Sequence, residues 1–100
     1  MAEVVILPLA TNDLEEIWSV IAFDSPRAAD RMVHRIVQRM GALEQFPELG
    51  PRRPDLGTNV RILIEHPYIV PYRYETGKRV EVIRVLHGAR DLFDEMDGID

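Results

Sequence analysis

Three side chains that could do chemistry stand close together near the C-terminus: Arg84, His87 and Arg90. Guanidinium groups bind anions and imidazole exchanges protons near neutral pH, so anion binding and proton transfer are the chemistry open to them. They interrupt or follow residues 80–86, V-E-V-I-R-V-L, a run with almost no polar face. Such a run predicts a strand in the middle of a sheet, and Gly88 lets the chain turn away from it. Polar groups at the end of a central strand are held rigidly and still meet solvent, so we expect a site there.

Composition excludes several other kinds of site. The 100 residues include no cysteine, which excludes disulfides and thiolate metal sites. The three histidines (His34, His66 and His87) lack metal-ligand spacing, so we expect neither a metal nor a cofactor. No apolar run approaches the ~20 residues of a membrane span and no basic leader precedes one, so we expect a cytoplasmic protein without membrane contact. The net charge of −5 disfavours nucleic-acid binding as the main function, and no direct, specific nucleic-acid binding is expected.

The first half of the chain predicts a strand followed by two helices. Residues 3–9 are a short apolar run that predicts the first strand. Asn12 followed by Glu15 fits a capping box, and apolar residues then recur at helical spacing, with Asp13 placed on the polar side. The apolar stripe of this first helix is Leu14, Ile17, Trp18, Ile21 and Ala22.

The second helix is predicted to follow almost at once. Ser25 before Pro26 is typical of a helix N-terminus. Only about two residues separate the helices, so they should form an antiparallel hairpin. Its apolar stripe is Ala29, Met32, Val33, Ile36, Val37, Met40 and Leu43. We expect one core that contains Trp18, Ile21, Val33, Ile36, Val37, Val82 and Val85.

The second half predicts an antiparallel meander. Residues 47–59 are rich in proline and glycine and should be irregular. Strands are predicted over residues 60–65, 68–74 and 80–86, and Pro71 indicates a bulge or an exposed edge in the second of them. The result is one α+β domain of the order β-α-α-β-β-β, with the helical hairpin packed on a mainly antiparallel sheet.

Several motifs carry a family resemblance. They are D-L-E-E-I-W at 13–18, S-P-R-A-A-D-R-M at 25–32, L-E-Q-F-P-E-L-G at 43–50, Arg61, Y-R-Y at 72–74 and R-V-L-H-G-A-R-D at 84–91. In this order they resemble the RelE/ParE toxin superfamily of bacterial toxin–antitoxin modules, and the ParE branch in particular. The resemblance covers nearly the whole chain, and the last motif is the most specific. Pro71 departs from the pattern, which usually has an apolar residue there.

The resemblance implies the toxin of a type II toxin–antitoxin system, with growth inhibition and plasmid stabilisation as its outcomes. ParE-like members poison DNA gyrase and trap it on cleaved DNA, whereas RelE-like members are ribosome-dependent mRNA endonucleases. We favour a ParE-like gyrase inhibitor that acts by binding rather than as an enzyme, because the chain is acidic and the ending H-G-A-R-D resembles that branch. The endonuclease is the alternative. A non-toxic member that binds an antitoxin or regulates its operon is the second alternative.

An endonuclease of this kind needs a base for the 2′-hydroxyl proton, an acid for the leaving oxygen and cations for the phosphorane charge. The residues that could supply these roles are Arg61, Arg73, Arg84 and His87. The interpretation that we favour pairs Arg84 with a carboxylate in or beside the sheet. It makes His87 and Arg90 hydrogen-bonding anchors of a C-terminal turn.

The second helix also carries an arginine stripe at i, i+4 spacing: Arg27, Arg31, Arg35 and Arg39. This stripe is either a solvated face or a docking surface for an acidic partner segment. The resemblance implies a cognate ParD-like antitoxin whose C-terminal segment is disordered when free and folds on the toxin, giving a hetero-oligomer. The partner-binding residues that we expect are Arg27, Arg31, Arg35, Arg39, Arg61, Arg84, His87 and Arg90.

Overall fold

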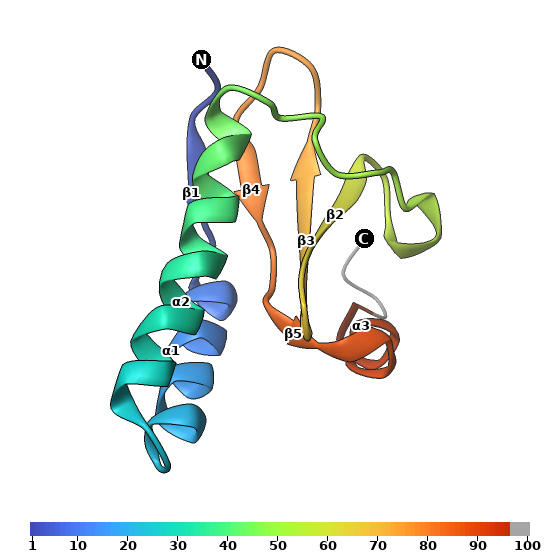
Figure 1. Cartoon of the computed structure of the whole chain (residues 1–100). Helices are drawn as coiled ribbons and strands as arrows, with labels where there is room; N and C mark the ends of the chain where they lie inside the picture. Colours follow the sequence, from blue (N-terminus) through green and yellow to red (C-terminus); the bar gives the residue numbers. More distant parts are fainter. Residues whose placement is uncertain (97–100) are drawn as a thin grey trace.

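A β-sheet with helices on both faces forms the molecule (Figure 1). The structure, a computed structural model, describes residues 1–96 without the side chains of residues 89 and 90. The predicted α+β fold is confirmed, and the described residues add one α-helix and two short 3-10 helices to those expected. The elements are β1 (Val4–Ile6), α1 (Pro8–Ala22), α2 (Pro26–Gly41), η1 (Ala42–Glu44), η2 (Pro54–Leu56), β2 (Val60–Glu65), β3 (Tyr68–Tyr74), β4 (Val80–Val82), β5 (Leu86–His87) and α3 (Gly88–Met96).

The sheet has the strand order β1-β4-β3-β2, and β5 pairs with β3 beyond the end of β4. The first strand runs parallel to β4, whereas the pairs β2–β3 and β3–β4 are antiparallel. The central place predicted for the strand after residue 79 is therefore confirmed, since β4 has a neighbour on each side. Its predicted continuity is wrong, because the strand is interrupted at residues 83–85.

The interruption lies opposite Pro71. This proline is buried within the inner strand β3, so an exposed edge there is wrong. Its carbonyl accepts the N–H of Ile83 (3.0 Å). The nitrogen of the same residue points toward the same neighbour, so Pro71 presents no hydrogen-bond donor to residues 83–85. From the register on each side, Val70 and Pro71 together oppose three residues of the neighbouring segment. This two-against-three pairing is a bulge, and it falls on the strand that faces the proline.

The start of α1 differs from the prediction, whereas the start of α2 confirms it. The chain leaves β1 at Ile6, Leu7 is the N-cap, and Pro8 occupies the first turn. Proline suits that position because its missing N–H would have had no helical partner. Asn12 consequently lies inside the helix, and the capping box is wrong. At α2 the Ser25 hydroxyl accepts the N–H of Ala28 (3.2 Å), as a cap should.

Two hydrophobic clusters lie on opposite faces of the sheet, because alternate strand residues point to opposite sides. The cluster under the helical hairpin contains Ala10, Ile17, Ile36, Met40, Leu43, Leu63, Tyr68, Val70, Tyr72, Val80, Val82 and Val85. The cluster under α3 and η2 contains Leu56, Val60, Ile62, Ile83, Leu86, Leu92 and Met96.

The predicted core is confirmed for five of its seven members. Ile36, Val82 and Val85 are buried, and Ile21 and Val33 pack against them. Trp18 and Val37 are wrong, since they are 40% and 41% exposed. The indole N–H of Trp18 donates to Asp30 (2.8 Å), so this ring ties α1 to α2 at the surface of the hairpin. Val37 sits one residue, or about 100°, past Ile36 and so falls at the edge of the buried stripe.

The last helix was not predicted, since only a turn was expected after Gly88. Gly88 does turn the chain, with a φ of +78°. Leu92 and Met96, four residues apart on α3, are then buried against the second face of the sheet. Within residues 1–96, no helix has the length and apolarity needed to cross a membrane.

Candidate functional site

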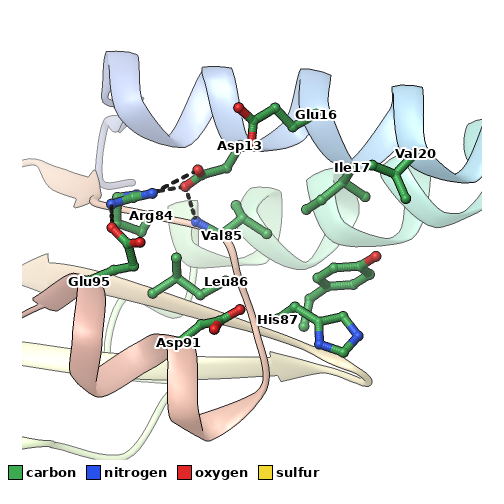
Figure 2. Close-up of a pocket in the computed structure, with 11 residues that line it drawn as sticks. Asp13, Glu16, Ile17, Val20, Arg84, Val85, Leu86, His87, Asp91 and Glu95 are labelled. Carbon is green, nitrogen blue, oxygen red and sulfur yellow. Dashed lines mark hydrogen bonds and ion pairs between the residues drawn. The ribbon is translucent and has the colours of Figure 1, made fainter.

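Asp13 of α1 and Arg84 of the bulge form a two-pronged ion pair (Figure 2). The Nε of Arg84 donates to Oδ2 of Asp13 (2.8 Å) and its Nη2 donates to Oδ1 (3.0 Å). The remaining nitrogen, Nη1, donates to Oε2 of Glu95 on α3 (3.0 Å). The side chains of Arg84 and Asp13 are only 14% and 10% exposed. The bonds to Asp13, and then those to Glu95, raise the pKa of Arg84 against the opposing effect of burial.

The bulge explains why Asp13 is needed. At the interruption the backbone N–H of Val85 has left the ladder, and it donates instead to Oδ2 of Asp13 (2.9 Å). The carboxylate therefore satisfies both a guanidinium and a backbone donor. The ion pair predicted for Arg84 is present, but the polar-side placement of Asp13 is wrong. The sequence held the signal, since Asp13 lies three residues after buried Ala10 and four before buried Ile17, on the same helical face.

An open groove surrounds this pair, between α1, residues 84–87 and α3. His87 lies at the end of the groove, exposed, with its ring edge-on to Tyr68 (centroids 5.4 Å apart, planes at 84°). The structure thus gives His87 a ring contact in place of the predicted hydrogen bond. Arg90 lies in the first turn of α3 and its side chain is not among those described, so its predicted role stays a prediction.

The other two residues of the possible nuclease set lie elsewhere. Arg61 uses its guanidinium to hold the 47–59 loop, donating to the carbonyls of Glu48 (3.1 Å) and Gly50 (2.8 Å). Arg73 is one position past Arg61 in the β2–β3 register and so points to the opposite face, where it lies 3.8 Å from Glu81. The structure therefore brings Arg84 and His87 into one groove, and it does not bring Arg61 or Arg73 there.

Tyr72 completes the attachment of the loop. Its buried hydroxyl donates to the carbonyl of Pro47 (2.8 Å) and accepts the N–H of Gly50 (2.9 Å). Burial raises the pKa of Tyr72, and the Gly50 N–H opposes this in part. A side chain at Gly50 would clash with the carbonyl of Ile62, so the close approach of loop and sheet requires glycine here.

The four arginines of α2 are all exposed. Arg39 donates to the carbonyl of Ile64 (3.4 Å), and Arg35 contacts Met32 within the helix. Arg27 and Arg31 have no hydrogen-bond or ion-pair partner in the part of the chain that the structure describes. The stripe thus presents positive charge without a described carboxylate partner along α2. This helix contributes none of the described residues that line the groove around Arg84.

The pattern of the family described as "ParE toxin of type II toxin-antitoxin system, parDE" matches residues 4–92. The chain belongs to this family. The match spans the hairpin, the whole sheet and the first half of α3, so it includes every described groove residue except Glu95.

Two relatives of this ParE-family chain have names that describe them as toxins. A protein of Sinorhizobium fredii named as a candidate toxin, Y4kP, is 37% identical over 78 residues, which are 78% of this chain and 79% of the relative. Toxin RelE2 of Caulobacter vibrioides is 34% identical over 90 residues, covering 90% of this chain and 99% of the relative. Among solved structures, the chromosomal ParDE toxin–antitoxin system from P. aeruginosa has a chain with a TM-score of 0.75 and 27% identity. That match covers 89% of this chain and 98% of the other.

The chemistry open to the ParE-family groove is limited by its residues. Among its described side chains, the guanidinium of Arg84 is already held by two carboxylates, and the imidazole of His87 contacts an aromatic ring. Across residues 1–96, no three His, Asp or Glu side chains are grouped so that they could hold a metal ion. The described part of the groove therefore offers a paired guanidinium and an exposed imidazole.

Proposed function

We propose that this toxin inhibits DNA gyrase by binding it in the cytoplasm, and that a cognate ParD-like antitoxin neutralises it. The observation that carries the proposal is the match of residues 4–92 to the ParE toxin family of parDE systems. A chain of the ParDE system from P. aeruginosa shares the fold over 98% of its length, which supports an antitoxin partner here.

The geometry favours inhibition by binding over RNA cleavage. An endonuclease needs several cations and a proton-transferring group around one phosphate. Here Arg84 is held by Asp13 and Glu95, and Arg61 is bound to loop carbonyls. Arg73 points to the other face of the sheet. A phosphate at His87 would therefore meet no free guanidinium from this set.

A second candidate function is ribosome-dependent mRNA cleavage. The specific observation in its favour is the 34% identity to a protein named Toxin RelE2. This candidate requires that Arg84 leave its carboxylate partners, or that the ribosome supply the missing cations.

The test is expression of the chain without an antitoxin in a growing bacterium. Gyrase inhibition predicts filamentation and induction of the DNA-damage response, whereas mRNA cleavage predicts rapid arrest of translation. Growth without either response would identify a non-toxic member that only binds an antitoxin or regulates its operon. A Val82→Asp variant is the control, because a charge at this fully buried position should prevent folding and abolish either response.

Purified protein then separates binding from cleavage. With gyrase and relaxed plasmid, the wild type should inhibit supercoiling and increase cleaved DNA after protein denaturation. With programmed ribosomes, it should leave the mRNA intact. Codon-dependent cleavage without any effect on gyrase would overturn the proposal.

A further inference from the structure

The groove around Arg84 has an acidic rim on both sides (Figure 2). Glu16 projects from α1, and Asp91 and Glu95 come from α3. Together with Asp13, four carboxylates line the groove against the single guanidinium of Arg84. The groove therefore has a clear excess of negative charge.

Two of these carboxylates are not neutralised. Arg84 is shared between Asp13 and Glu95. Glu16 and Asp91 are exposed and have no cationic partner among the side chains that the structure describes. They stand on α1 and α3, the two helices that wall the groove (Figure 2), so a cation bound between the walls would be attracted from both sides.

The floor between the two rims is apolar. Ile17 and Leu86 are buried beneath it, and Val20 stands at its edge with 74% of its surface exposed. A long basic side chain packs its methylene stem on apolar surface while its charged end meets carboxylates. The combination of floor and rim fits an arginine or lysine better than it fits an acidic or a fully apolar segment.

We propose that this groove docks a basic segment of the target enzyme, with an arginine or lysine side chain inserted between Glu16 and Asp91. The inference rests on the proposed function. An enzyme that handles DNA presents basic surfaces to the phosphates, and an acidic groove complements such a surface. The net charge of −5 would also speed encounter with it. The antitoxin is expected on a different surface, the arginine stripe of α2, whose charge is opposite to that of the groove.

The experiment compares two double variants with the same change in charge on the same two helices. Glu16→Gln with Asp91→Asn neutralises the groove. Glu15→Gln with Asp94→Asn neutralises exposed carboxylates that do not line it. Each protein is titrated against the intact gyrase tetramer and against the cognate antitoxin, at low and at physiological salt. Circular dichroism and thermal unfolding check that all variants are folded.

The groove variant should bind gyrase about tenfold more weakly at low salt, with a difference that shrinks as salt rises. The control pair should stay within about twofold of the wild type, and antitoxin binding should be unchanged in both. Equal loss of gyrase affinity in the groove variant and in the control variant would show that only the overall charge matters, and would overturn the proposal. Loss of antitoxin binding rather than gyrase binding in the groove variant would overturn it too.

The design separates this inference from the proposed function. If the wild type binds gyrase and the groove variant binds equally well, the groove is not the docking site while the function stands. If the wild type does not bind gyrase, the proposed target is wrong, and a synthetic peptide of alternating arginine and leucine then decides the groove. Binding of that peptide to the wild type, lost in the groove variant only, would keep a basic-segment site. Absence of binding would overturn it.

Discussion

Asp13 and Arg84 are 71 residues apart in the sequence, yet they form the ion pair that joins α1 to the bulge of the sheet. The same carboxylate accepts the N–H of Val85, a donor that the bulge has removed from the ladder. Glu95 extends the contact to α3. One guanidinium thus links the hairpin, the sheet and the last helix, and it fixes the two walls of the groove relative to each other.

Replacing Asp13 by Asn should destabilise the fold by about 3 kcal/mol. The amide keeps one acceptor but places an N–H₂ group against a guanidinium, leaving a mostly buried charge with only the half-exposed carboxylate of Glu95. Urea unfolding followed by circular dichroism measures the change in the free energy of unfolding.

Two matched variants define what would contradict this result. Glu95→Gln removes the half-exposed partner of Arg84 and should cost less than about 1 kcal/mol. Asp24→Asn at the exposed turn between the helices should be within about 0.5 kcal/mol of the wild type. If Asp13→Asn behaved like Asp24→Asn, the ion pair would contribute nothing to the fold.

Local signals made most of the fold predictable from the sequence. Ser25-Pro26 placed the start of α2 correctly, and the bounds of β2 and β3 were predicted at residues 60–65 and 68–74. The wrong predictions of local structure arose where two sequence signals competed. Asn12 resembled a cap, but Pro8 had already started the helix, so the predicted first strand was too long.

Features that depend on distant residues were not predictable in the same way. That β1 runs parallel beside β4 follows from the whole topology and from no local pattern. A bulge was one of the two outcomes predicted at Pro71, but it falls on the neighbouring strand, more than ten residues along the chain. Asp13 was misplaced because a carboxylate is usually solvated, and only the position of Arg84 in space makes its burial favourable.

Tyr72 provides a prediction about pH. Tyr72→Phe should cost about 1–3 kcal/mol at neutral pH, because the Gly50 N–H and the Pro47 carbonyl lose their partner. The pKa of Tyr72 is raised in the folded state, so the unfolded chain loses this proton first, from about pH 10 upward. Stability from this group is therefore present below pH 10 and is lost as the pH rises through the folded pKa.

Unfolding free energies measured from about pH 8 to about pH 11.5 test the predicted direction of this pH dependence. The wild type should lose stability above pH 10, and Tyr72→Phe should lose less. Some loss should remain, because burial also raises the pKa of Tyr68. Tyr74→Phe, at a half-buried ring at the end of β3, is the control and should leave the neutral-pH stability nearly unchanged. An identical alkaline slope in Tyr72→Phe would show that the hydroxyl is not protonated as inferred.

His87→Ala should not abolish toxicity through loss of a general base, because the imidazole contacts Tyr68 and the proposed function needs no proton transfer. The lost ring contact should cost no more than about 1 kcal/mol of stability. The decisive measurement is mRNA cleavage on programmed ribosomes, with His34→Ala as the exposed control. Codon-dependent cleavage by the wild type that disappears in folded His87→Ala would favour the endonuclease.

Reversing Arg31 and Arg35 to Glu should weaken binding of the antitoxin without unfolding the toxin. Both side chains are exposed on α2, so the free energy of unfolding should change by less than about 1 kcal/mol. An acidic antitoxin segment laid along the stripe would lose two attractions and gain two repulsions. We expect a loss of about 2–3 kcal/mol at low salt that declines as salt is added.

The measurement is titration calorimetry of the toxin with its cognate antitoxin at about 20 and about 200 mM salt, because exposed charges are screened weakly at the first concentration and strongly at the second. The matched control is Arg52→Glu with Lys78→Glu, which reverses two exposed charges away from α2. Equal weakening in the control would indicate a general charge effect. A double reversal on α2 that binds as tightly as the wild type at low salt would make the stripe a solvated face. The antitoxin would then have to contact the toxin elsewhere, and the irregular 47–59 loop is the next surface to test.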